Sequence, residues 1–276
     1  MAPMGKEGAS NYEGKWALVT GAGRKGRVGE TIAKRLAAKG ANIYLHYRPG
    51  GDAEAVEVKR GVEEAGAAFR IEVVLVAADL TQESDITRTF TNIRPDIVIH
   101  NAAVFEPARV APDASLEDAV AEHTRVFEKN INANLYAVQV STEAAIHEMR
   151  KQKRTGTFVF VGDAFIEHGG VYGDGLAAYT ASKAAVEKLV AYFQTNYGAA
   201  GFRFFAVLNG PIEPPPSAPE ESVEEIADEL PVPEEEKDPW LGADRVADAI
   251  IAGIDGKLTG VIDADGGRRW TTAREH

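Results

Sequence analysis

Short apolar runs alternate along the chain with longer segments in which apolar residues recur at helical spacing. The first run, Trp16–Thr20, is mainly apolar, stops at Gly21 and predicts a buried strand. The next segment, Glu30–Lys39, ends at Gly40 and predicts an amphipathic helix. Its apolar residues share one helical face: Ile32, Ala33, Leu36 and Ala37.

The same alternation continues along the rest of the chain. Further strands are predicted at Asn42–Tyr47, Ile71–Ala77, Ile97–His100, Thr157–Val161, Phe202–Leu208 and Gly260–Asp263. Helices are predicted at Ala53–Ala65, Gln82–Thr91, Leu116–Arg150, Ala178–Tyr197 and Gly242–Ile254. Strands that alternate with helices favour parallel pairing, and nearly continuous apolar strands are typical of a sheet covered on both faces. We therefore predict an α/β protein with a single-domain Rossmann fold, a doubly wound parallel sheet of about seven strands.

Two segments depart from this rhythm. Residues 1–14 are polar, and we expect a flexible N-terminal tail before a single domain over residues 15–276. Residues 212–239 are rich in proline and acidic side chains. This segment is either a solvated surface excursion or a substrate lid, since long loops in compact domains are often functional.

Composition narrows the function classes. The chain has 276 residues, a formal net charge of -12 and no cysteine, so disulfides and cysteine catalysis are excluded. The acidic balance argues against a nucleic-acid partner. No apolar run approaches the ~20 residues of a membrane span, and the first residues lack the apolar core of a secretory signal, so we expect a cytoplasmic protein. The six histidines are scattered, and no metal site is predicted.

A glycine-rich loop follows the first predicted strand and precedes the first predicted helix. Glycines allow a backbone to turn tightly and approach a pyrophosphate, and the helix N-terminus then offers unpaired N–H groups to that anion. In this context the loop predicts a dinucleotide site, although a glycine cluster alone is often only a turn. The candidate cofactor-binding residues here are Gly21, Gly23, Arg24, Lys25, Gly26, Val28 and Gly29.

The end of the second strand indicates which nicotinamide cofactor would fit. An NAD site places an acidic residue there to hold the ribose hydroxyls. This chain instead has Tyr47 and Arg48, and Arg24, Lys25 and Arg48 could surround a 2′-phosphate. We therefore expect NADPH/NADP+ rather than NAD, with the alternative that these are ordinary surface cations.

Tyr179 and Lys183 stand four residues apart in a predicted helix, so they face the same side. An ammonium beside a phenol favours the phenolate and lowers the phenol pKa from its reference value near ~10. Such a pair suits general acid–base catalysis. In isolation, a surface pair would be the simpler interpretation.

With this pair included, the chain resembles the short-chain dehydrogenase/reductase family over Lys15–Arg269. The motifs occur in the family's order: the glycine loop, Ala78-Asp79-Leu80, Asn101-Ala102-Ala103, Asn134-Leu135, Tyr179-x-x-x-Lys183, Asn209-Gly210-Pro211-Ile212 and Asp265-Gly266-Gly267. The resemblance implies a homodimer or homotetramer formed through the long helices.

The resemblance also implies residue roles. Tyr179 would be the general acid/base, Lys183 would hold the nicotinamide ribose and lower the tyrosine pKa, and Asn134 would kink its helix and support a relay water. The remaining implied cofactor contacts are Asp79 and Leu80 at the adenine, Asn101, Ala102 and Ala103 beside the adenosine ribose, and Gly210 and Ile212 at the carboxamide.

The chain departs from the family's common pattern at the glycine loop and at the catalytic serine. The long loop resembles that of divergent enoyl-carrier-protein reductases, which space their tyrosine and lysine further apart, so that activity is not expected. Counting from Gly156 places Asp163 where the family has its serine. In having an Asp at the serine position followed by Ala164, the chain resembles pteridine reductases. An ionised carboxylate only accepts hydrogen bonds, so it suits substrates with N–H or iminium character. The alternative is a structural role for Asp163.

The sequence therefore predicts an NADPH-dependent oxidoreductase that reduces a C=O or C=N group of a small molecule, with Tyr179 as general acid. Three alternatives stay open. The enzyme could run in the oxidising direction, the fold could serve as an NADP-binding scaffold or redox sensor, or the pocket could support non-redox tailoring chemistry.

Overall fold

A seven-stranded parallel sheet forms the centre of the molecule, in the order β3-β2-β1-β4-β5-β6-β7. The computed structural model describes residues 12–167, 169–170, 172–210 and 242–264. The strands are β1 (Trp16–Val19), β2 (Asn42–Tyr47), β3 (Val73–Ala77), β4 (Ile97–His100), β5 (Thr157–Asp163), β6 (Arg203–Asn209) and β7 (Gly260–Asp263). The sheet confirms the predicted doubly wound Rossmann fold.

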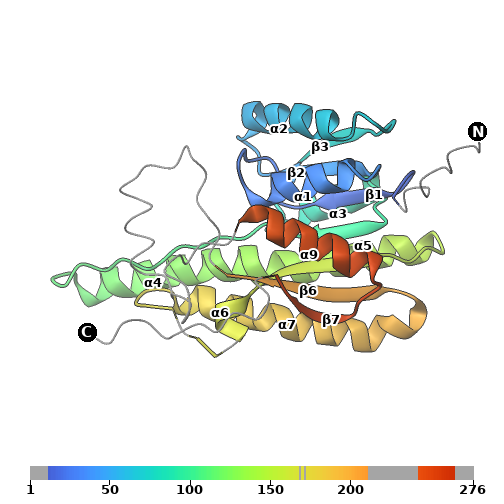
Figure 1. Ribbon diagram of the computed structural model, residues 1–276. Coiled ribbons are helices and arrows are strands. Elements are labelled where there is room, and N and C mark those ends of the chain that lie inside the picture. The colour runs from blue at the N-terminus through green and yellow to red at the C-terminus, as the bar shows by residue number, and fades with distance from the viewer. Residues whose placement is uncertain (1–11, 168, 171, 211–241, 265–276) are drawn as a thin grey trace, which may run out of the picture.

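Helices cover both faces of the sheet (Figure 1). One face carries α1 (Val28–Ala37), α2 (Asp52–Ala65) and α9 (Ala243–Asp255). The other carries α3 (Glu83–Asn92), α5 (Ala137–Lys151) and α7 (Ala177–Tyr197), with α4 (Leu116–Ile131) running into α5 as one long rod. A short helix, α6 (Ala164–Glu167), joins β5 to the loop before α7.

Alternate residues of the strands enter two separate cores. In β1, Ala17 and Val19 pack toward α1 and α9, whereas Leu18 packs toward α3 and α5, and all three are fully buried. β6 repeats this with Phe205 on one face and Phe204 on the other. Burying an aliphatic or aromatic side chain of this size stabilises the fold by roughly 1.5–3 kcal/mol. Layers on both faces explain why the strands read as continuous apolar runs.

Three local features differ from the sequence-based expectation. The predicted strand Thr157–Val161 continues to Asp163, because it pairs with β6 along its whole length. The predicted helix Leu116–Arg150 is interrupted by a π-helical turn at Asn132–Tyr136. Tyr12, placed in the predicted flexible tail, is buried and donates a hydrogen bond to Asp255 Oδ1 at 2.8 Å.

The order of the strands reverses direction between β1 and β4. The chain winds from β1 outward to β3, then returns to β4 and winds the other way. In open α/β sheets this reversal leaves a crevice outside the carboxyl ends of the strands, where ligands bind. The glycine loop after β1 and the loop after β4 lie at this point.

Two buried histidines lie at the carboxyl ends of β2 and β4. His46 Nδ1 accepts from the Gly21 N–H at 3.1 Å, and its Nε2–H donates to the Ala78 carbonyl at 3.1 Å. His100 Nε2–H donates to Thr142 Oγ1 at 2.9 Å. Burial lowers the pKa of His46 to about 4 and that of His100 to about 3. Both imidazoles are therefore neutral at neutral pH.

These histidines predict a loss of stability in acid. In the unfolded chain a histidine titrates near ~6.5, so below that pH the unfolded state binds protons that the folded state refuses. The free energy of unfolding should fall by about 2 kcal/mol per histidine between about pH 7 and about pH 5. Urea unfolding of the wild type, His100→Gln and the exposed-site control His147→Gln measures this. The loss should shrink only in His100→Gln, and equal pH slopes in all three would contradict the assignment.

Candidate active site

The glycine loop is packed too tightly for side chains at three positions. A Cβ on Gly21, whose φ is +66°, would lie 2.8 Å from Ala102 Cα. A Cβ on Gly23 would lie 2.4 Å from Tyr47 Cβ, and one on Gly29 would lie 2.6 Å from the Gly21 carbonyl oxygen. The glycines therefore let the loop close against the ends of β2 and β4.

Side chains from neighbouring strands hold this loop in place. Besides His46, Asn101 Nδ2 donates to the Thr20 carbonyl at 2.9 Å. Thr20 Oγ1 accepts from the Asn101 and Ala102 N–H groups at 3.0 Å each. Asn101 thus joins β1 to β4 at the point where the sheet reverses.

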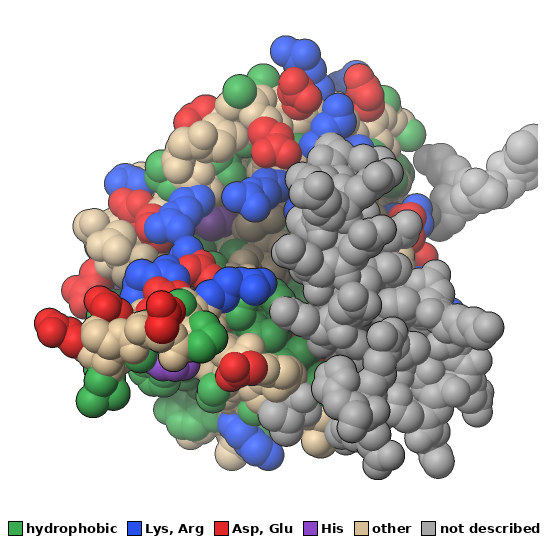
Figure 2. All heavy atoms as spheres, turned by 90° about the vertical axis from the view of Figure 1, so that its left-hand side faces the viewer, with side chains coloured by type: hydrophobic (Ala, Val, Ile, Leu, Met, Phe, Trp, Pro, Cys, Tyr) green, Lys and Arg blue, Asp and Glu red, His purple; other side chains and the backbone are tan. Residues whose placement is uncertain are grey.

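The loop leads into the N-terminus of α1, which has no side-chain cap at Arg27. The first N–H groups of a helix lack partners within the helix and carry partial positive charge. Arg24, Lys25 and Arg27 are exposed beside them. Lys and Arg side chains gather on this face of the molecule (Figure 2). The arrangement fits an anionic phosphate group.

Carboxylates from α2 and from the end of β3 reach the same region. Arg48 pairs with Asp79 at 2.9 Å, and Tyr47 Oη donates to Asp52 Oδ1 at 2.8 Å. The Lys25 N–H donates to Glu54 Oε1 at 2.9 Å, and Lys25 Nζ pairs with Glu57 at 3.6 Å. The sequence analysis examined only the end of β2, so it missed the acidic side chains that α2 brings to this region.

The remaining predicted cofactor residues have simpler positions. Leu80 is buried after β3, while Ala103 is exposed after Asn101 and Ala102. Gly26 has a φ of +69°, and its N–H donates to Glu30 Oε2 at 2.6 Å. Gly210 is buried beyond β6, and Ile212 lies outside the described residues.

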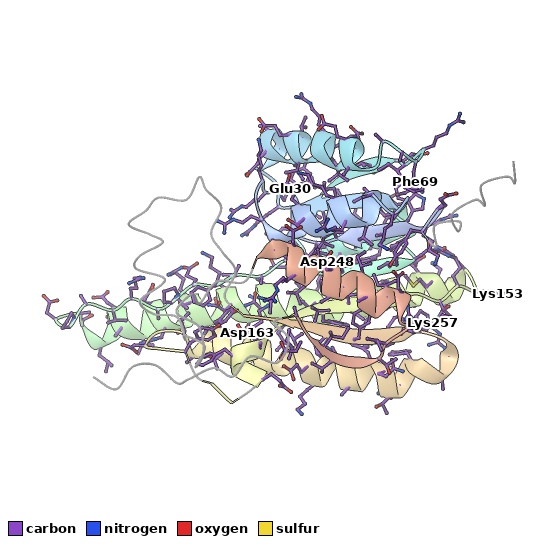
Figure 3. All side chains as sticks on the ribbon, in the orientation of Figure 1. Glu30, Phe69, Lys153, Asp163, Asp248 and Lys257 are labelled. Atoms are coloured by element: carbon purple, nitrogen blue, oxygen red, sulfur yellow. The ribbon has the colours of Figure 1, made fainter. Side chains whose placement is uncertain are left out.

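A buried carboxylate lies at the centre of the catalytic candidates. Asp163 is only 5% exposed, at the carboxyl end of β5. Figure 3 places it far from Lys153, which lies beyond the opposite ends of the strands, where they begin. Asp163 Oδ2 accepts hydrogen bonds from Tyr179 Oη and from Tyr172 Oη, both at 2.9 Å, and Oδ1 accepts from the Ile166 N–H at 3.2 Å.

Lys183 lies one helical turn beyond Tyr179 and is buried. Its Nζ donates to the Val161 carbonyl at 3.1 Å and lies 6.0 Å from the centroid of the Tyr179 ring. Burial lowers the pKa of Lys183, which the Asp163 carboxylate opposes. Burial raises the pKa of Asp163, and the Lys183 ammonium opposes that shift.

The pKa of Tyr179 shifts in the direction opposite to the expectation. Burial raises it well above the reference value, and the adjacent Asp163 carboxylate raises it further. The expected lowering by Lys183 does not appear in this structure, because burial, the largest cause, and the contacting Asp163 carboxylate both raise the pKa of Tyr179. Tyr179 is held as a protonated phenol.

Asn134 lies within the π-helical turn and is buried. Its Oδ1 accepts from the Val104 N–H at 2.7 Å, and its Nδ2 donates to the Val104 carbonyl at 2.8 Å and to Ser182 Oγ at 3.0 Å. Ser182 Oγ in turn donates to the Tyr179 carbonyl at 2.7 Å. Asn134 thus ties the loop after β4 to the helix that carries Tyr179.

Sequence reasoning missed an aromatic cluster around Tyr179. The rings of Phe105 and Tyr172 lie 4.7 Å and 5.5 Å from the Tyr179 ring, both edge to face, and Phe165 lies 5.0 Å from Tyr172. The only available signal was the lengthened loop between Asp163 and Tyr179. Phe105 remains 41% exposed while its ring contacts the ring of Tyr179.

Among the described residues, no three His, Cys, Asp or Glu side chains come together as a metal site would require. Within the same part of the chain, every helix is too short or too polar to cross a membrane.

Residues 21–237 match a family model described as enoyl-(acyl carrier protein) reductase. The match covers most of the chain. The chain belongs to the short-chain dehydrogenase/reductase family. Its relatives include a hydroxynaphthalene reductase-like protein of Metarhizium guizhouense, 29% identical over 217 residues that cover 75% of this chain and 72% of the relative. A 2-dehydro-3-deoxy-D-gluconate 5-dehydrogenase of Bacillus subtilis is 28% identical over 73% of this chain and 72% of its own length.

Solved structures of short-chain dehydrogenase/reductases share the fold. An angucycline C-6 ketoreductase with bound NADP is 23% identical, with a TM-score of 0.71, and the match covers 92% of this chain and 95% of that one. A blue fluorescent protein from a metagenomic library, in complex with NADPH, is 24% identical with a TM-score of 0.69 over 92% and 98% of the two chains. At these identities the likeness shows the fold alone. The family membership shows an oxidoreductase.

Proposed function

We propose that this short-chain dehydrogenase/reductase transfers a hydride from NADPH to a C=O or C=N group of a small molecule, with Tyr179 as proton donor. The observation that carries the proposal is the protonated Tyr179 hydroxyl, hydrogen-bonded to Asp163, with the buried Lys183 Nζ 6.0 Å from the centroid of the Tyr179 ring. These groups lie at the carboxyl ends of the strands, on the same side of the sheet as the glycine loop.

The cofactor would lie across the reversal point of the sheet. The uncapped start of α1 and the Gly21–Gly29 loop would hold its pyrophosphate, and the turn at Asp79 and Leu80 would contact the adenine. Lys183 would hold the nicotinamide ribose. A bound nicotinamide supplies the hydride. The proposed contact through Ile212 falls outside the described residues.

NADP over NAD is the finer part of this proposal. Arg24, Lys25 and Arg48 are exposed beside the end of β2, which supports a site for a 2′-phosphate. Arg48 is bound to Asp79, and Lys25 to Glu57, so the phosphate would exchange these surface ion pairs for its own. Exposed ion pairs contribute roughly 0–1 kcal/mol, so this exchange costs little.

Arg48→Ala tests the cofactor preference. NADPH affinity should fall on the order of tenfold, since a hydrogen bond to a charged group is lost, while NADH affinity changes little. Fluorescence titration with both cofactors measures this, with Lys151→Ala, at the far end of α5, as the charge control. Equal affinity of the wild type for NADPH and NADH would refute the preference.

Asp163 determines where the Tyr179 proton can go. When the carboxylate is ionised, Tyr179 donates to it, and the phenol oxygen can accept a hydrogen bond from a substrate N–H. When Asp163 is protonated, it can donate to Tyr179, which frees the Tyr179 proton for the substrate. The pair therefore offers both an acceptor and a donor to a nitrogen-containing group.

This arrangement favours substrates that bear N–H groups or become iminium ions. As its proton leaves during the reaction, Asp163 becomes a carboxylate, which repels a developing alkoxide and stabilises a developing cation on nitrogen. The exposed Phe105 ring beside Tyr179 would suit a planar substrate. The pteridine-reductase likeness of Asp163-Ala164 agrees with this preference.

Self-association is also proposed, as a homodimer or homotetramer. Leu116, Val120 and Phe127 expose apolar surface on α4, and Tyr192 does so on the neighbouring α7. Burying this surface between copies would remove it from water. Light scattering on a purified sample would report the assembly, and a monomer at micromolar concentration would refute it.

Tyr179→Phe tests the proton donor. General acid catalysis typically contributes 10²–10⁴-fold, so kcat should fall on that scale while NADPH binding stays nearly intact. The control is Tyr197→Phe, on the same helix as Tyr179, which removes a hydroxyl that donates a hydrogen bond to Glu143 on α5. Turnover within about tenfold of the wild type would show that the proton comes from another group.

Asp163→Ser tests substrate selection. At neutral pH, reduction of a simple ketone should rise, because the hydroxyl donates to the carbonyl oxygen and no longer repels the alkoxide. Reduction of a pterin or a cyclic imine should fall. Steady-state rates with one substrate of each kind give the result. If both rates move together, or neither moves, Asp163 does not select the substrate.

A further inference from the structure

Tyr172 belongs to the lengthened loop between α6 and α7, and the proposed function assigns it no role. Its hydroxyl donates to the same carboxylate oxygen as Tyr179, at the same distance of 2.9 Å. We propose that Tyr172 is a positioning residue for proton delivery, which holds the Asp163 carboxylate against Tyr179 and shares the negative charge that Asp163 acquires as the proton leaves. This role rests on the proposed function of Tyr179.

Side chains from neighbouring segments fix the Tyr172 ring from several sides. Phe105, Phe165 and Tyr179 contact it edge to face, with ring centroids 5.8, 5.0 and 5.5 Å away. Tyr172 is only 8% exposed. The Ala108 N–H donates to the Gly175 carbonyl at 2.9 Å, which joins this loop to the loop after β4. The hydroxyl is therefore held in place by packing.

The charges on Tyr179 and Asp163 determine the protonation state from which the reaction can start. If Tyr179 gave up its proton beside an ionised Asp163, two negative charges would lie 2.9 Å apart, which is strongly unfavourable. The balanced step starts from protonated Asp163. The Tyr179 proton passes to the substrate nitrogen or oxygen, and the Asp163 proton passes to Tyr179 Oη. The substrate carbon takes the hydride, Tyr179 ends neutral, and Asp163 ends as a carboxylate.

In that final state the carboxylate is stabilised by the groups around it. Tyr172 Oη and the Ile166 N–H donate to it directly, and Lys183 provides the nearby positive charge. The Tyr172 hydrogen bond also favours the ionised form, which opposes the raised pKa that burial gives Asp163.

Two other carboxyl groups lie near Asp163. Glu167 lies on α6 and Glu187 on α7, and burial together with the hydrogen bond to Glu167 raises the pKa of Glu187 to about 8. The Glu167–Glu187 pair therefore holds one proton at neutral pH. Asn209, opposite Asp163 on β6, is uncharged. Removing the Tyr172 hydroxyl changes Asp163 without changing any of these charges.

Tyr172→Phe keeps the ring packing and removes only the hydroxyl. Reduction requires protonated Asp163, so kcat/KM should fall with rising pH as Asp163 ionises. Without the Tyr172 hydrogen bond this upper limb should move to higher pH by roughly half a pH unit or more, about threefold in proton activity. Tyr197→Phe, which also removes a tyrosine–carboxylate hydrogen bond, should leave the limb unchanged.

A second readout follows Asp163 itself. Carbon-13 NMR of protein labelled at aspartate Cγ, with the resonance assigned by its loss in Asp163→Asn, should show the same shift of titration in Tyr172→Phe. An unchanged titration, or an equal shift in Tyr197→Phe, overturns the role of Tyr172. A shifted titration with an unchanged rate profile overturns its part in proton delivery. Absence of turnover by the wild type with NADPH overturns the proposed function itself, while the NMR titration still reports on the Tyr172–Asp163 contact.

Discussion

A carboxylate that is almost fully buried must be surrounded by donors or lose its charge, and the residues around the carboxyl end of β5 are arranged to meet that constraint. Asp163 ends β5, and its donors come from three different segments: α6, the loop that follows it, and α7. An unpaired ion in such a place would cost several kcal/mol. The tyrosines and the lysine therefore serve the fold and the chemistry together, since removing any one of them leaves Asp163 less well satisfied.

The sequence predicted the sheet well because each strand carries its own signal. The bounds of β2, β4 and β7 agree with the predicted ranges, and Asp163 lies at the strand end where counting from Gly156 placed it. The π-helical turn at Asn132–Tyr136 could not be seen from periodicity, because one inserted residue per turn barely disturbs an apolar stripe. Tyr12 was misplaced because a single aromatic residue in a polar segment gives no sign that it will reach α9.

The site was predicted less completely than the fold, and the reason is electrostatic. Spacing alone indicated that Lys183 would lower the pKa of Tyr179, but the shift depends first on burial and then on which charge is nearer in space. Asp163 is sixteen residues away in sequence and in hydrogen-bond contact in the structure. Tyr172 and His46 escaped notice for the same reason, because their partners are set by tertiary contacts that no local pattern encodes.

The imidazole of His46 carries a further consequence. It accepts from the Gly21 N–H on one side and donates to the Ala78 carbonyl on the other, so it links the glycine loop after β1 to the turn after β3. Only the neutral ring can perform both tasks, since an imidazolium has no lone pair left for Gly21. The two turns thus share one proton state, and a single protonation event would break the side-chain link between them while the Ala22 N–H still donates to the His46 carbonyl at 2.9 Å.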